Sequence, residues 1–105
     1  MANKNAKLTN AKKKEYRSIG HNLNPVIIVS DNGISEGLIK ETERALDDHE
    51  LIKVKFNVGD RDARAELIKE LCNSTRAELV QTIGKIALIL RIAKERNEQL
   101  SNLMR

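Results

Sequence analysis

The 105-residue sequence has almost none of the residues that hold small proteins together through disulfides or metals. It contains one cysteine and two histidines. One cysteine cannot form an internal disulfide, and these three residues are too few for the four-ligand site of a structural zinc. We therefore expect no metal and no cofactor. The length is typical of one domain, and a hydrophobic content of 40% favours an ordinary globular fold.

Long hydrophobic runs are also missing from the sequence. No segment approaches the roughly 18 consecutive apolar residues of a membrane span. The N-terminal sequence MANKNAKLTNAKKK has no apolar stretch that could form the core of a signal peptide. From these absences we expect a soluble, cytoplasmic protein without a membrane partner.

Aromatic residues are nearly absent, since the chain has one tyrosine, one phenylalanine and no tryptophan. Tyr16 and Phe56 both fall on the predicted packing faces of their elements. A sheet surface that stacks nucleic-acid bases on aromatic rings is therefore not expected.

The residue types used in catalysis are scattered along the chain. Cys72 and His49 fall on helix faces expected to be packed, and His21 follows a predicted helix end. Most acidic residues lie on outward helix faces, where solvation is the usual state. We expect neither an enzyme nor a small-molecule substrate.

Positive charge is concentrated at one end of the sequence. The formal net charge is +4, and residues 1–20 carry six Lys or Arg residues against one Glu. Residues 21–105 carry thirteen Lys or Arg residues against fourteen acidic ones. Such asymmetry favours a polyanionic partner, and nucleic acid before membrane because the basic end lacks a broad apolar face.

Helix caps, hydrophobic periodicity and turn signals predict seven elements. The first helix follows Thr9 and stops at Gly20, and the next two are capped by Ser35 and Asp60. The four strands are short apolar or alternating runs. In chain order the elements are helix 10–19, strand 26–29, helix 35–48, strand 51–58, a helix after Asp60, strand 77–83 and strand 86–91. The helix after Asp60 should pack through Ala63, Leu67, Ile68, Leu71 and Cys72. A type II′ turn at Gly84-Lys85 should join the last two strands.

This order predicts a compact single α/β domain, α-β-α-β-α-β-β, with a four-stranded mixed sheet packed against helices. The two later helices should share one sheet face. Residues 26–29 and 86–90 are apolar at both parities, so the first helix should cover part of the other face. We expect this packing to bring its basic side near the turn at Ser30 to Gly33. The predicted boundaries are a flexible basic segment 1–8, a folded domain 9–92 and a polar tail 93–105.

Two neighbouring features are the candidate binding residues. The first is the basic side of the first helix, with Lys12, Lys13, Lys14 and Arg17. The second is the turn Ser30-Asp31-Asn32-Gly33 and the helix start after it, where unpaired backbone N–H groups can hold a phosphate, with Lys40 near the same end. A solvated helix face and a plain tight turn are the simpler interpretations.

Lys53 and Lys55 alternate with apolar residues along the second predicted strand. They would add to a binding surface if their sheet face is exposed. If that strand lies at the edge of the sheet, the same two lysines could instead prevent aggregation.

Several short motifs occur in an order that resembles a known family. They are Leu8-Thr9, Asn24-Pro25-Val26, the NGISEG stretch at 32–37, HELIKVK at 49–55 and VQTIGK at 80–85. Together they resemble the CRM (chloroplast RNA splicing and ribosome maturation) domain in its bacterial stand-alone, YhbY-type form, over about residues 8 to 92.

The resemblance implies a domain similar to the C-terminal domain of translation initiation factor 3. It also implies RNA binding through a KH-like GxxG loop and association with precursors of the large ribosomal subunit. That loop corresponds to residues 30–33, with Ser30 in place of the first glycine. Leu90 stands where the family often has tyrosine.

Our hypothesis is a monomeric, non-enzymatic protein that contacts the phosphates of rRNA in large-subunit precursors. One alternative is a protein-interaction module that docks on a ribosomal protein or assembly factor through the polar sheet face. Another is a general nucleic-acid-binding protein that binds duplex DNA as tightly as structured RNA.

Overall fold

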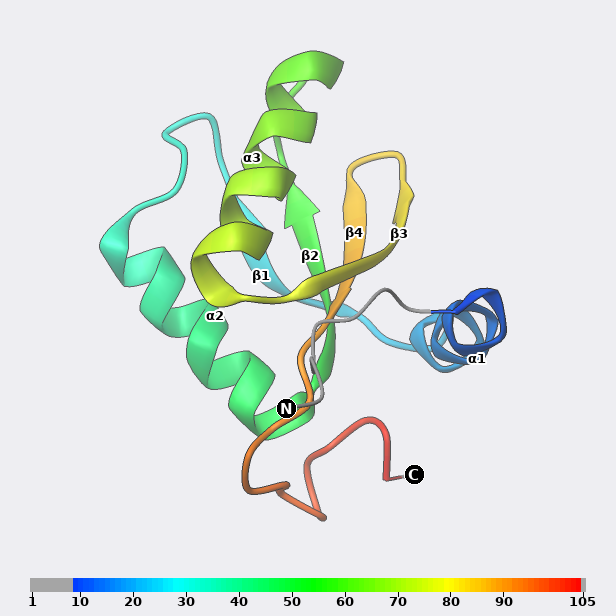
Figure 1. Cartoon of the computed structure of the whole chain (residues 1–105). Coiled ribbons are helices and arrows are strands. Elements are labelled where there is room, and N and C mark those ends of the chain that lie inside the picture. Colours follow the sequence, from blue (N-terminus) through cyan, green and yellow to red (C-terminus); the bar gives the residue numbers. More distant parts are fainter. Residues whose placement is uncertain (1–8, 105) are drawn as a thin grey trace.

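The computed structural model describes residues 9–104, so the predicted basic segment 1–8 lies outside the described residues. The seven elements follow the predicted order (Figure 1). They are α1 (Asn10–Gly20), β1 (Pro25–Val29), α2 (Glu36–His49), β2 (Leu51–Phe56), α3 (Arg61–Thr75), β3 (Glu78–Ile83) and β4 (Ile86–Leu90).

The three predicted helix caps are confirmed. The side chains of Thr9, Ser35 and Asp60 each accept a hydrogen bond from a backbone N–H in the first turn, at 3.1, 3.0 and 2.7 Å. Such bonds satisfy donors that have no partner within the helix. The two-residue turn between β3 and β4 is also confirmed, and Gly84 has the positive φ of 57° that the first position of a type II′ turn requires.

The sheet has the strand order β1-β2-β4-β3. β1 and β2 are parallel, and β4 runs antiparallel to both of its neighbours, β2 and β3. The sheet is therefore mixed, as predicted. β2 is an interior strand, and it ends at Phe56 rather than at the predicted Val58.

The larger core lies between the sheet and the pair α2 and α3. Ile52, Val54 and Phe56 of β2 are buried there against Leu46 of α2 and Leu71 of α3. The predicted packing stripe of α3 is wrong at one position, because Ala63 is exposed. Its neighbour Arg64 is half-buried instead and donates a hydrogen bond to the Val58 carbonyl at 2.9 Å.

A second, smaller core lies on the opposite face, under α1. Tyr16 of α1 packs there with Leu51, Val80, Leu88 and Leu90. The prediction that α1 covers part of the second sheet face is confirmed. Gly20, predicted as a helix stop, is instead the last residue of α1, and it is buried.

Gly20 sets the distance between α1 and the sheet. A Cβ atom at this position would lie 2.6 and 2.8 Å from the two Cδ atoms of Leu88, which is itself buried. We expect Gly20→Ala to lower the free energy of unfolding by about 1 to 2 kcal/mol, because the packed leucine must move. Urea denaturation measures this change. Gly59→Ala is the matched control, since nothing lies within 4 Å of a Cβ there and its φ is not positive.

Residues 92–104 pack on the corner between α2 and β2 (Figure 1, orange to red). Ser101 and Asn102 are buried, and the Asn102 side chain donates a hydrogen bond to the Leu51 carbonyl at 2.6 Å. The Nδ1 atom of His49 lies 3.0 Å from the Leu100 carbonyl oxygen. The segment therefore belongs to the folded structure.

Glu50 is the centre of this attachment, and its side chain is fully buried. One carboxylate oxygen accepts from the Ser101 hydroxyl at 2.6 Å and pairs with Arg96 at 2.7 Å. The other accepts from the Ala93 backbone N–H at 2.6 Å. The φ of Glu50 is 64°, in the region that favours glycine.

Candidate nucleic-acid interface

The sheet face that carries α1 is only partly covered. Register places side chains from several strands in rows across this face. The row of Leu51 and Leu90 lies under α1 and is buried. Beyond it come the row of Lys53, Leu88 and Gln81, and then the row of Ile28, Lys55, Ile86 and Ile83. We call these last two rows the open sheet face.

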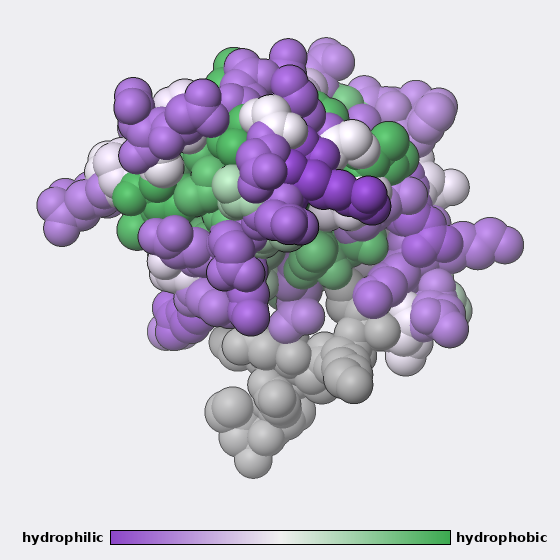
Figure 2. Space-filling model, turned by 90° about the horizontal axis from the view of Figure 1, so that it is seen from above, coloured by the Kyte–Doolittle hydropathy of each residue, from purple (hydrophilic) through white to green (hydrophobic). Residues whose placement is uncertain are grey.

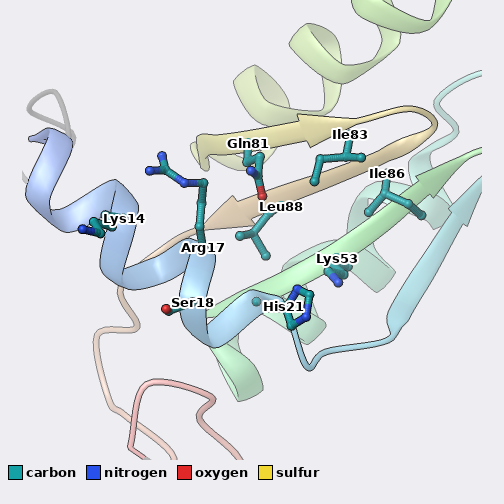
Figure 3. Close-up of a pocket in the computed structure, with 10 residues that line it drawn as sticks. Lys14, Arg17, Ser18, His21, Lys53, Gln81, Ile83, Ile86 and Leu88 are labelled. Atoms are coloured by element: carbon teal, nitrogen blue, oxygen red, sulfur yellow. The ribbon is translucent and has the colours of Figure 1, made fainter.

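A groove runs between α1 and the open sheet face, with a cavity volume of about 460 Å³ (Figure 3). Lys14 and Arg17 from α1 and Lys53 from β2 supply its positive charge. The Arg17 side chain extends from α1 toward β3 (Figure 3). Among residues 9–104, none of those that line this groove is acidic. It is therefore suited to an anion.

The position of β2 in the sheet decides between the two interpretations of Lys53 and Lys55. Both lysines lie on β2, between β1 and β4 in the strand order. Protection of an exposed strand edge is therefore not their role. Both side chains are half-buried, and each is flanked in its row by an aliphatic residue of β4, Leu88 or Ile86.

The predicted loop lies elsewhere in the molecule. Residues 30–33 connect β1 to α2, and Figure 1 shows this cyan loop at the upper left, with α1 on the right. The expectation that the basic side of α1 lies near this loop is wrong. The reason is that α1 packs against β2 and β3 at the end of the sheet where β1 begins. The loop follows the opposite end of β1.

Within the loop, two of the predicted phosphate donors are already used. The Asn32 N–H donates to the Ser30 hydroxyl at 3.3 Å, and the Gly33 N–H donates to the Ser30 carbonyl at 3.0 Å. Asp31 adds a negative charge. Gly33 has a φ of 86°, whereas Ser30 has no positive φ and replaces the first glycine of the motif without backbone strain.

The remaining predicted residues occupy different surroundings. Lys12 is exposed and pairs with Glu15 at 3.5 Å, and Lys13 is half-buried on α1 outside the groove lining. Lys40 is exposed on α2, on the other side of the sheet from α1. The structure thus brings Lys14 and Arg17 together with Lys53, and it separates this group from the loop and Lys40.

Sequence reasoning did not identify three polar residues that line the groove. They are Ser18 and His21 at the end of α1 and Gln81 on β3. Ser18 follows Lys14 by four residues, so helical spacing offered a signal. Gln81 had no such signal, because a bulge between Leu79 and Gln81 shifts the register of β3 and puts it on the same face as Val80.

Leu90 belongs to the smaller core under α1. Leu90 is buried with Tyr16 and Leu51. Phe56 is buried in the other core. Neither aromatic ring of the chain is therefore exposed for base stacking.

The only cysteine is buried at the end of α3, as the sequence predicts. Burial raises the pKa of the Cys72 thiol to about 11, with a smaller contribution from the negative charge of Glu78. The thiol stays protonated at neutral pH, so it is a poor nucleophile. Within residues 9–104, no three His, Cys, Asp or Glu side chains gather as metal ligands would. In the same range no helix has both the length and the hydrophobicity to cross a membrane.

The outer surface is largely hydrophilic in the view of Figure 2, with hydrophobic groups exposed in patches between polar side chains. Several large hydrophobic residues are exposed on the molecule. Of these, Ile28 and Ile83 belong to the open sheet face, and they are 61% and 66% exposed. Apolar and basic groups therefore alternate on this one face.

The sequence is similar to those of known proteins over most of its length. A protein of Pseudomonas aeruginosa, named a probable RNA-binding protein, is 53% identical over 93% of this chain and 94% of its own length. An RNA-binding protein of Haemophilus influenzae is 40% identical over 89% of this chain and 94% of its own.

A solved structure has a similar fold. The solution structure of a Staphylococcus aureus protein, described as a candidate RNA-binding protein, matches with a TM-score of 0.75 and 39% identity. The match covers 88% of this chain and 96% of that one. The family model of the CRS1 / YhbY (CRM) domain matches residues 8–91. The chain therefore belongs to the CRS1/YhbY (CRM) domain family.

Proposed function

We propose that this protein binds structured RNA, without catalysis, through phosphates held between α1 and the open sheet face. One observation carries the proposal: Lys14, Arg17 and Lys53 line one groove, and within the described part of the chain no acidic residue lines it with them. Two relatives that are similar over nearly their whole length are named for RNA binding or probable RNA binding. Contacts to phosphates position RNA without reading its sequence.

We further propose that the RNA is rRNA in precursors of the large ribosomal subunit, bound in the cytoplasm by a monomer. The resemblance to YhbY-type proteins supports this assignment. Sedimentation of a lysate through a sucrose gradient tests it, with each fraction probed for the protein and for unprocessed rRNA ends. We expect the protein to travel with large-subunit precursors and to leave them as the salt concentration rises, because phosphate contacts are weakened by salt.

The alternatives predict different results in the same experiment. A module that docks on a ribosomal protein would stay with the particles after a salt wash and after RNase treatment. A general nucleic-acid-binding protein would bind a DNA duplex as tightly as structured RNA in a direct titration. A protein that remains at the top of the gradient has no place in ribosome assembly.

The loop at residues 30–33 is proposed as a second, weaker phosphate contact, together with Lys40 at the start of α2. Asn32→Asp tests it, since Asn32 is exposed and this change adds charge without altering the positive φ of Gly33. If a phosphate lies at the loop, RNA affinity at low salt should fall about threefold to tenfold through charge repulsion.

Fluorescence anisotropy with a structured rRNA fragment measures this affinity. Asn73→Asp is the matched control, because Asn73 is exposed on α3 and the change in net charge is the same. An equal effect of the two substitutions would remove the loop from the interface.

A further inference from the structure

The open sheet face has a feature that phosphate binding does not use. Ile83 and Ile86 are paired across β3 and β4, and both line the groove together with Leu88. Ile83 is 66% exposed. An aliphatic surface beside three cations costs free energy in water unless an apolar group covers it.

Two uncharged polar side chains, those of Gln81 and His21, lie in the same groove as these aliphatic residues. Gln81 follows Leu88 in the row across the sheet, and its amide both donates and accepts hydrogen bonds. Within residues 9–104, the side chains of Gln81 and His21 make no hydrogen bond to the protein. Figure 3 shows Gln81 and Ile83 on β3 facing the same side as Leu88 and Ile86 on β4.

We propose that the groove binds one unpaired nucleotide of the RNA. Its base lies on Ile83 and Ile86, beside the buried Leu88, and the Gln81 amide contacts the base edge. Lys14, Arg17 and Lys53 hold the phosphates on either side. This inference rests on the proposed function and adds to it the form of RNA that is preferred, a bulge or loop rather than a continuous duplex.

The dimensions and chemistry of the groove favour this occupant. A volume of about 460 Å³ falls in the range of about 300 to 1,000 Å³ that is usual for small-ligand sites. A nucleotide combines an apolar base face with a charged phosphate, which matches an aliphatic floor with a cationic rim. A base inside a duplex is covered on both faces by its neighbours, so it cannot reach this floor.

The test uses three short RNA hairpins that differ at one position. The first has a single bulged adenosine, the second has an abasic bulge that keeps the same phosphates, and the third is fully paired. We expect the wild-type protein to bind the first about fivefold to tenfold more tightly than the other two, since only the first can bury a base on the floor.

Two substitutions on β3 complete the experiment. Ile83→Ser removes part of the floor without changing charge, and Leu79→Ser is the matched control, because Leu79 is exposed on the same strand and faces the α3 side. We expect Ile83→Ser to abolish the preference for the bulged base and to leave the salt dependence of binding unchanged. Leu79→Ser should keep the preference.

The possible outcomes separate this inference from the proposed function. Equal wild-type affinity for the bulged and abasic hairpins would overturn the nucleotide site and leave RNA binding through phosphates intact. A preference that survives Ile83→Ser would also overturn it, because the base would then lie elsewhere. Failure to bind any of the hairpins would contradict the proposed function itself.

Discussion

Replacement of Lys14, Arg17 and Lys53 by alanine together is expected to weaken RNA binding about 100-fold at moderate salt. All three side chains line one groove, so one RNA can contact them at once. Each phosphate contact that is lost should flatten the slope of log K against log salt by about 0.7 to 0.9, which gives a total change of about 2 to 3 for three contacts. Titrations at several salt concentrations measure both quantities.

The matched control removes the same net charge from other surfaces. Arg44 on α2, Lys69 on α3 and Lys94 in the C-terminal segment are all exposed, and none forms an ion pair within the described residues. Their triple alanine variant should keep its salt slope and lose little affinity. If both triple variants lose affinity equally, the binding depends on net charge alone, and the groove is not the interface.

The fold was largely predictable because its signals are local. Thr9, Ser35 and Asp60 begin helices through bonds to residues three positions away. Alternation along β2 separates Ile52 and Val54 from Lys53 and Lys55 on the two faces of the sheet. These patterns depend only on neighbouring residues in the sequence, so they can be read without knowledge of the tertiary structure.

The candidate site was less predictable because it depends on strand order. The charges of α1 were visible in the sequence, but Lys53 and Gln81 join them only through the order β2-β4-β3 and the bulge in β3. The expected proximity of α1 to the loop at 30–33 failed for the same reason. The sequence predicts that α1 covers a sheet face, but it does not say which end of that face is covered.

The C-terminal segment is the part of the structure that the sequence predicted least. The Ser101 hydroxyl donates a hydrogen bond to the Glu50 carboxylate, although the two residues lie 51 positions apart in the sequence. The sequence of residues 92–104 is polar, and it favours a frayed helix or a solvated tail over a packed segment. Here the polarity has a specific use, because the segment supplies donors to a carboxylate that β2 and α2 bury.

Replacement of Glu50 by alanine is expected to lower the free energy of unfolding by about 3 kcal/mol. The substitution removes the acceptor for Ser101, Arg96 and the Ala93 N–H. The buried Ser101 hydroxyl keeps the hydrogen bond that it accepts from the Leu103 N–H, but its own proton loses its acceptor. Glu50→Gly should be less destabilising than Glu50→Ala by about 1 kcal/mol, because glycine accepts the φ of 64° without strain. Urea denaturation of the two variants measures the difference.

A double-mutant cycle with Ser101→Ala shows whether the segment is held through this contact. Ser101→Ala alone should be destabilising, since a buried charged acceptor loses a donor at 2.6 Å. In the Glu50→Ala background the same change should cost little, and the coupling between the two sites should be about 1 to 2 kcal/mol. Additive effects would mean that the contact with Ser101 is not the means by which Glu50 stabilises the fold. The RNA affinity of the folded single variants should stay near that of the wild type, because neither residue lines the groove.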